Sequence, residues 1–222
     1  MEVEVTEQQR KKLQRASDIT SIQMLMAQFV DCMSKMDVSG VFDRLFAHDD
    51  DRASIELFDS GEYRGEAHVR AFLDAYDAYL ADPADKRGWM ELQLLCTPYV
   101  KLNEDCTSAL GTWSLFCPSA KYAMPYPCDQ QKLTAIWISG KYICEFKKVE
   151  GAWKILKLRS TAYLRSPFEY GWDVQPDCTS MPVLPGVHPD GPAREFLYNF
   201  DYGMGNAGIE WGPYLPEDGE YK

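Results

Sequence analysis

Three side chains in the C-terminal half of the chain, two phenols and a guanidinium, are the strongest candidates for chemistry. They are Tyr142, Tyr163 and Arg165. Side chains alternate between the two faces of a strand, so Tyr163 and Arg165 are expected to share a face with Thr161. Tyr142 falls in an earlier strand-like segment, on an apolar face that is expected to point inward. The other members of that face are Ile136, Ile138, Cys144 and Phe146.

The pairing of a tyrosine with an arginine indicates acid–base chemistry. A neighbouring positive charge favours the phenolate, so the tyrosine can act as a base, or as a hydrogen-bond donor to a developing oxyanion. Arg165 would pair with a carboxylate or phenolate of the substrate. Two structural alternatives stay open: both tyrosines are core aromatics with their hydroxyls bonded to the backbone, and Arg165 forms an ion pair with Asp37, Glu169 or Asp173.

The cysteines and histidines do not have the spacing of a metal site. No two cysteines are closer than ten residues, and the three histidines are far apart in the sequence. An odd number of cysteines in apolar patterns favours reduced, buried thiols in a cytoplasmic protein. The glycine-rich patterns that hold nucleotide phosphates are absent from the sequence, so neither a metal nor an organic cofactor is expected. The cysteines are Cys32, Cys96, Cys106, Cys117, Cys128, Cys144 and Cys178.

Charge and hydropathy exclude several classes of partner. Acidic residues outnumber basic ones by 34 to 23, which gives a net charge of −11. A nucleic-acid-binding surface needs clustered Lys and Arg, and an anionic membrane would repel this chain. No apolar run approaches the roughly 18 residues of a membrane span, and the first residues do not resemble a signal peptide.

The hydrophobic periodicity predicts three helices followed by long strands. A polar, helical lead-in over residues 7–16 precedes a helix that is expected to start at Ser17 or Asp18, where either side chain can cap it. A sheet of long antiparallel strands needs one face covered, and the preceding helices can cover it. The sequence therefore predicts an α+β half-barrel, in which a curved antiparallel sheet packs on three N-terminal helices. The expected helices span 17–36, 39–49 and 66–80, and the expected strands span 53–58, 89–102, 107–116, 133–149 and 153–165.

The composition changes after about residue 175. Residues 176–222 are rich in Pro, Gly and aromatic side chains. Such a mixture forbids long regular elements, yet aromatics are unusual in a disordered tail. We expect a polar lead-in over 1–16, one domain over 17–175, and an irregular arm that packs on its own domain or on a neighbouring subunit.

The order of elements and several local patterns resemble the nuclear-transport-factor-two-like superfamily, especially its SnoaL-like branch. The patterns are "LFAHDD" near residue 48, "GEYRGEAHVRAFL" over 61–73 and "GKYICEFKKVEGAWKILKL" over 140–158. The resemblance covers roughly residues 17–168. It implies a cone-shaped half-barrel with a deep apolar pocket, as in dehydratases of scytalone and bile acids, ketosteroid isomerases and polyketide cyclases.

Within this branch, the bile-acid dehydratase type is the most similar in spacing. Its arginine matches Arg165, within "AYLRSPFEY". Its tyrosine, two aspartates and histidine match residues that lack acid–base groups. The resemblance thus implies a pocket that keeps one cation, with Phe29, Met33, Cys96, Trp113 and Cys117 as substrate-binding residues. Phe29 stands in place of the tyrosine, Ser34 and Cys117 in place of the two aspartates, and Cys96 in place of the histidine.

Three functions remain open from the sequence. The first is a cofactor-free lyase or isomerase for a hydrophobic aromatic or polycyclic molecule. The second is a non-catalytic binding protein or accessory subunit, and the third is a β subunit of a ring-hydroxylating oxygenase. An apolar strip on the convex sheet face also predicts a homo-oligomer, with a trimer favoured over a dimer. The strip is expected to consist of Trp137, Ile143, Leu156, Leu158 and Leu164.

Overall fold

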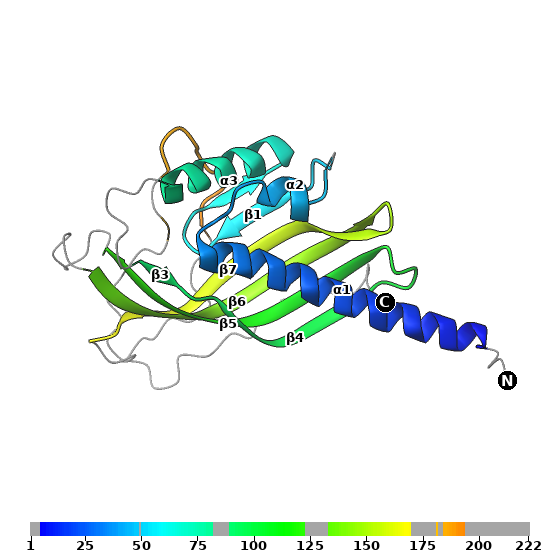
Figure 1. The fold of residues 1–222 in the computed structure, drawn as a ribbon. Coiled ribbons are helices and arrows are strands. Elements are labelled where there is room, and N and C mark those ends of the chain that lie inside the picture. The colour runs from blue at the N-terminus through cyan, green and yellow to red at the C-terminus, as the bar shows by residue number, and fades with distance from the viewer. Residues whose placement is uncertain are drawn as a thin grey trace, which may run out of the picture.

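The computed structural model describes residues 5–48, 50–81, 89–122, 133–169, 181 and 184–193. A long helix and a short one open the chain, a two-stranded ribbon leads to a third helix, and long antiparallel strands follow (Figure 1). This arrangement confirms the α+β half-barrel. The elements are α1 (Glu7–Lys35), α2 (Val41–Leu45), β1 (Ser54–Leu57), β2 (Glu62–Arg64), α3 (Glu66–Ala81), β3 (Met90–Glu91), β4 (Leu94–Leu102), β5 (Ser108–Tyr122), β6 (Leu133–Val149) and β7 (Ala152–Pro167).

One curved sheet organises the described part of the molecule. Its strands follow the order β2-β1-β7-β6-β5-β3, and β4 also pairs with β5. All pairs are antiparallel except β1 with β7, which is parallel. Figure 1 shows α1 lying across one face of the sheet, with α3 close to the β1–β2 ribbon. None of the described helices is both long enough and apolar enough to cross a membrane.

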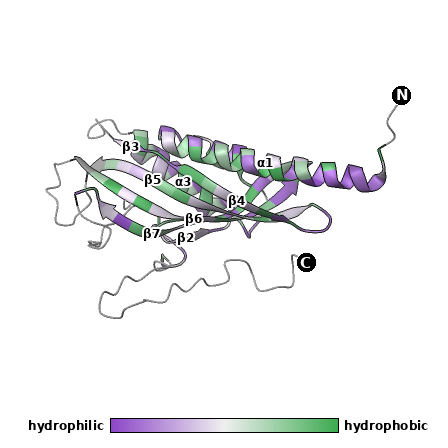
Figure 2. Ribbon diagram, turned by 90° about the horizontal axis from the view of Figure 1, so that it is seen from below, coloured by the Kyte–Doolittle hydropathy of each residue, from purple (hydrophilic) through white to green (hydrophobic). Residues whose placement is uncertain are grey.

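The first helix begins earlier than predicted. Thr6 caps it through a capping box with Gln9, so the helix starts at Glu7 and the expected start at Ser17 or Asp18 was wrong. The first turns are polar and project beyond the sheet (Figure 2). Further along, apolar side chains recur every three or four residues and pack on the sheet. The buried apolar residues of α1 are Ile22, Leu25, Met26, Phe29, Val30 and Met33.

Alternation along β6 determines the inner face of the sheet. The even-numbered residues Ile138, Tyr142, Cys144 and Phe146 are buried in the core, and Ile136 packs against it, so the predicted inward face is confirmed. On β5 the odd-numbered residues face inward, because each is the partner of an even-numbered residue of β6.

Two bulges complicate β7. The pairing with β6 shifts by one residue between Glu145 and Phe146, and again between Ser139 and Gly140. Each shift moves the following side chains to the other face. Between the bulges Leu158 is the partner of Cys144 and points into the core, so its expected place on the convex face was wrong.

The second bulge restores the original alternation at the end of β7. Arg165 is the partner of the inward residue Ile138 and therefore lies on the inner face. Thr161 is the partner of Lys141 on the opposite face. The expectation that Thr161 and Arg165 share a face was therefore wrong.

The described part of the C-terminal arm packs on its own domain. Met181 and Leu184 are buried in the core. Beyond them, Gly191 exchanges backbone hydrogen bonds with Glu62 of β2, and Asp190 accepts hydrogen bonds from the Arg64 amide and the His68 ring. The rest of the arm lies outside the described residues.

Candidate active site

A reversed polar pattern marks the edge of the sheet at β3. Glu91 and Gln93 are buried, at 6% and 5% exposure, whereas Met90, Leu92 and Leu94 are each more than 40% exposed. Register explains the inversion, because Glu91 is the partner of Ser119, one of the inward residues of β5. Two polar side chains are thus directed into an otherwise apolar interior.

These two side chains form a hydrogen-bonded chain with Tyr142. The Tyr142 hydroxyl donates to Gln93 Oε1 at 2.6 Å, and Gln93 Nε2 donates to Glu91 Oε1 at 2.7 Å. The backbone N–H of Gln93 donates to the Ser34 hydroxyl at 3.0 Å, which ties the segment to the end of α1. Helix and sheet together therefore fix the position of the Glu91 carboxylate.

The tyrosine of this chain remains protonated at neutral pH. Burial raises the pKa of Tyr142 well above its ordinary value, and the nearby Cys117 and Glu91 raise it further. Arg165 is the partner of Ile138, which is four residues and roughly 13 Å along β6 from Tyr142. Of the two expected roles of Tyr142, a base or a hydrogen-bond donor, its hydroxyl has that of a donor, with Gln93 as the acceptor.

Aromatic side chains surround this polar chain. The ring of Phe29 meets the ring of Tyr142 edge-on, with centroids 6.0 Å apart. Trp113, the partner of Tyr142 on β5, packs edge-on against Phe146 at 5.9 Å. Gly111 permits this packing, since a side chain at that position would collide with both rings. Met33 and Cys117 are also buried in the same core cluster.

Arg165 is buried on the inner face and has an acidic partner. Its Nη1 lies 3.0 Å from Asp59 Oδ2, in the turn after β1. The sequence alternatives for that partner were Asp37, Glu169 and Asp173, and Asp59 was not among them. The other oxygen of Asp59 accepts the Met181 backbone N–H at 2.9 Å. Asp59 thus connects the buried cation to the returning arm.

Two further predicted residues differ from the buried core in exposure. Cys96 is exposed, because its partner Ser114 is an outward residue of β5, so its expected place in the pocket lining was wrong. Tyr163 falls at the second bulge of β7 and is partly buried.

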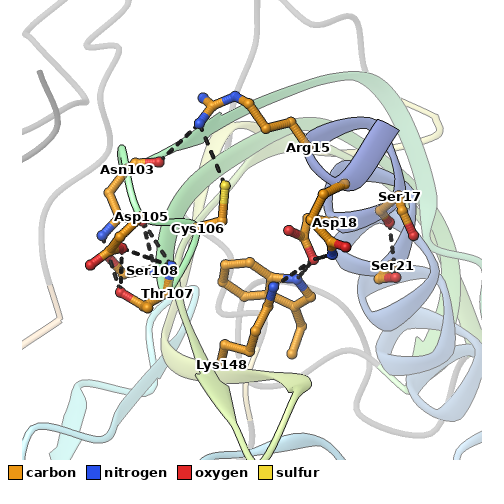
Figure 3. Close-up of polar contacts among 12 residues, drawn as sticks. Arg15, Ser17, Asp18, Ser21, Asn103, Asp105, Cys106, Thr107, Ser108 and Lys148 are labelled. Atoms are coloured by element: carbon orange, nitrogen blue, oxygen red, sulfur yellow. Dashed lines mark hydrogen bonds and ion pairs between the residues drawn. The ribbon is translucent and has the colours of Figure 1, made fainter. Parts of the chain in front are cut away.

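A second polar cluster holds the middle of α1 against the sheet (Figure 3). Asp18 Oδ1 accepts hydrogen bonds from Lys148 Nζ at 2.7 Å and from Trp153 Nε1 at 2.8 Å. Arg15 reaches the β4–β5 turn and donates to the Asn103 carbonyl at 3.1 Å. Asp18 is about 24 Å along the helix from Ser34, so this cluster is structural and separate from the Glu91 chain.

Glu91 and Gln93 were not recognised in the sequence as site residues. The segment 90–94 alternates apolar and polar residues, which normally places the apolar ones inside. The direction of the alternation depends on pairing with β5, and a single sequence does not report it. Within the described residues, no group of three or more His, Cys, Asp or Glu side chains could hold a metal ion.

Comparison with known proteins supplies a family and a fold. The family model of the SnoaL-like domain matches residues 14–159. A hexachlorocyclohexane dehydrochlorinase, LinA type 2, is 17% identical, with 79% of this chain and 99% of that chain covered and a TM-score of 0.53. LinA type 3 from Novosphingobium barchaimii LL02 is 16% identical, with 71% and 94% covered and a TM-score of 0.51.

A third structure has no activity in its name. The Kfla4162 protein from Kribbella flavida is 15% identical, with 68% of this chain and 95% of that chain covered and a TM-score of 0.50. No curated protein sequence matches the chain. At these identities, the likeness to solved structures concerns the fold alone.

Proposed function

Because the chain belongs to the SnoaL-like domain family, we propose that it is a cofactor-independent lyase or isomerase. The proposed substrate is a hydrophobic aromatic or polycyclic small molecule. The observation that carries the proposal is a carboxylate, Glu91, held inside an apolar half-barrel by a buried amide and a buried phenol.

Glu91 has the chemistry of a general base. A base must lie where the reacting carbon can reach it and must be fixed in orientation. The amide N–H of Gln93 donates to the Glu91 carboxylate, and the Tyr142 hydroxyl fixes that amide by donating to its oxygen. The Gln93 N–H thus holds the Glu91 carboxylate in one orientation, and Tyr142 holds the amide that does so.

The proposed step is removal of a proton from a carbon atom of the substrate. Glu91 takes the proton, and the electron pair of the broken C–H bond forms a carbon–carbon double bond. In a lyase, a group on the adjacent carbon leaves with its bonding electrons. In an isomerase, the adjacent carbon belongs to a carbonyl whose π electrons move onto its oxygen, and the carbonyl re-forms when the proton returns from Glu91 to a different carbon of the same conjugated system.

Charge stabilisation and substrate binding fall to the other residues predicted from the sequence. Arg165 would stabilise negative charge that develops on the substrate, and the buried Tyr163 hydroxyl would assist as a donor. Asp59 holds the guanidinium in place. We assign binding of the hydrophobic frame to Phe29, Met33, Trp113 and Cys117.

Proton exchange tests the proposal without knowledge of the leaving group. The probe is α-tetralone, a bicyclic aromatic ketone with acidic hydrogens next to its carbonyl, dissolved in heavy water. We expect the protein to accelerate deuterium incorporation at that carbon, measured by NMR, and we expect a chelator to leave the rate unchanged. Exchange no faster than in buffer, at concentrations where α-tetralone binds, would identify a non-catalytic binding protein instead.

Arg165 is expected to contribute charge stabilisation to this reaction. In the same assay, Arg165→Ala should slow exchange by about 30-fold, equivalent to about 2 kcal/mol, because the developing enolate loses a cation. Arg10→Ala is the control, since that arginine is exposed on the first turns of α1. An Arg165→Ala protein with wild-type Tm and wild-type exchange would remove Arg165 from the mechanism.

We also propose that the outer sheet face forms contacts between subunits, with a homotrimer favoured over a dimer. Several large apolar side chains there are exposed, including Leu92, Leu94 and Phe168. On the same face, Trp137 stacks on Phe116 and lies tilted against Phe168. An apolar surface of this kind is typical of protein–protein contacts.

A further inference from the structure

A buried hydroxyl beside Glu91 takes no part in the hydrogen-bonded chain. Ser119 is 2% exposed, and its Oγ has no hydrogen-bond partner among the residues that the structure describes. Buried side-chain hydroxyls nearly always have a partner, so each exception needs an explanation. A serine hydroxyl offers one donor and two acceptor positions.

The register fixes the direction of this hydroxyl. Ser119 continues the inward series of β5, whose members Trp113, Leu115 and Cys117 are all buried in the core. Its partner on one side is Glu91, and its partner on the other side is Ile136. Directly opposite residues of antiparallel strands have Cβ atoms roughly 5 Å apart, so the hydroxyl lies beside the Glu91 side chain.

Apolar and charged side chains both lie near Ser119 on the inner face of the sheet. Ile136 lies in the same row as Ser119, and the next inward row holds Cys117, Ile138 and Arg165. A ligand in this region would therefore meet hydrocarbon together with a hydroxyl and a carboxylate side by side, and with a guanidinium one row away.

We propose that Ser119 is a substrate-binding residue that donates a hydrogen bond to an oxygen atom of the ligand. This inference rests on the proposed function, and it narrows the substrate class to an apolar ring system with a carbonyl oxygen. The oxygen is held by Ser119, and the neighbouring carbon faces Glu91. When Glu91 removes a proton from that carbon, the negative charge moves to the oxygen, where the Ser119 donor stabilises it.

Binding of two probes that differ by one oxygen tests the inference. α-Tetralone carries the carbonyl, and tetralin is the corresponding hydrocarbon. By calorimetric titration, we expect the wild-type protein to bind α-tetralone about 3- to 10-fold more tightly than tetralin, the usual range for one hydrogen bond. Ser119→Ala should abolish this preference and leave the affinity for tetralin unchanged. Ser114→Ala is the matched control, because that serine lies on the same strand but points outward and is exposed.

The outcomes separate this inference from the proposed function. Equal affinities of the wild-type protein for both probes, or a preference that survives in Ser119→Ala, would overturn the role of Ser119 even if deuterium exchange is observed. A preference that depends on Ser119 without any exchange would keep the binding role and overturn the enzyme. If Ser119→Ala fails to fold, Ser119→Cys keeps the side chain with a weaker donor and should reduce the preference.

Discussion

Glu91→Gln should slow deuterium exchange into α-tetralone by about 100- to 10,000-fold, the usual contribution of a general base. Glutamine keeps the size of the side chain, and its carbonyl oxygen can still accept the hydrogen bond from Gln93. What is lost is the ability to take a proton. The fold should persist, because every hydrogen bond of the buried chain can still form.

The measurement is the NMR exchange rate at saturating α-tetralone, together with the affinity for the ketone. Glu104→Gln, in the exposed turn after β4, makes the same chemical change away from the interior and should leave the rate unchanged. A Glu91→Gln protein that binds α-tetralone and exchanges it at the wild-type rate would show that another group is the base.

Asp18→Ala should lower the free energy of unfolding by about 3 kcal/mol, the low end of the range for breaking a buried ion pair. Asp18 is 4% exposed and accepts hydrogen bonds from Lys148 and Trp153. Without it, the Lys148 ammonium loses its acidic partner, and the buried indole N–H loses its acceptor. Urea unfolding measures the change. Asp31→Ala breaks an exposed pair with Lys35 on the same helix and should cost less than about 1 kcal/mol.

The same carboxylate makes stability depend on pH. Burial raises the pKa of Asp18, but the hydrogen bonds from Lys148, Trp153 and Gln14 outweigh it, and the net pKa lies below the ordinary value of 3.8. A carboxyl group with a lowered pKa contributes stability above its unfolded pKa and loses it as the pH falls through the folded one. The loss in free energy of unfolding that Asp18→Ala causes should therefore become smaller below about pH 4. If that loss in free energy of unfolding stays constant down to pH 2, it arises from packing of the Asp18 side chain and not from its charge.

The spacing of apolar residues in the sequence predicted most of the helices and strands. The bounds of β6 over 133–149 were predicted as observed, because its apolar alternation is unbroken and Glu150-Gly151 ends it in a turn. Helix α3 was predicted from 66 to 80 and ends at Ala81, because its apolar residues recur at helical spacing. The start of α1 was missed because its first ten residues are polar and have no apolar period, so only the capping box of Thr6 and Gln9 indicates them.

The site was less predictable than the frame. Alternation placed Tyr142 correctly on the inner face, since β6 has a regular inward series. It failed on β7, where two bulges reverse the faces twice, so that Arg165 is inward while Thr161 is not. Bulges arise from pairing between strands that are distant in sequence, and propensity within one strand does not reveal them. Glu91 was missed for a related reason, because its inward direction follows from its pairing with Ser119.

The reversed pattern at residues 90–94 also bears on how this chain can evolve or be engineered. Methionine and two leucines face outward there, where burial would be more favourable, while a glutamate and a glutamine occupy the interior. Exchanging the polar and apolar positions would make a drier core and a more soluble edge, a change that selection for folding alone would favour. It would also delete the carboxylate. Because the proposed activity depends on that carboxylate, stability-guided redesign of this protein should leave these five positions untouched.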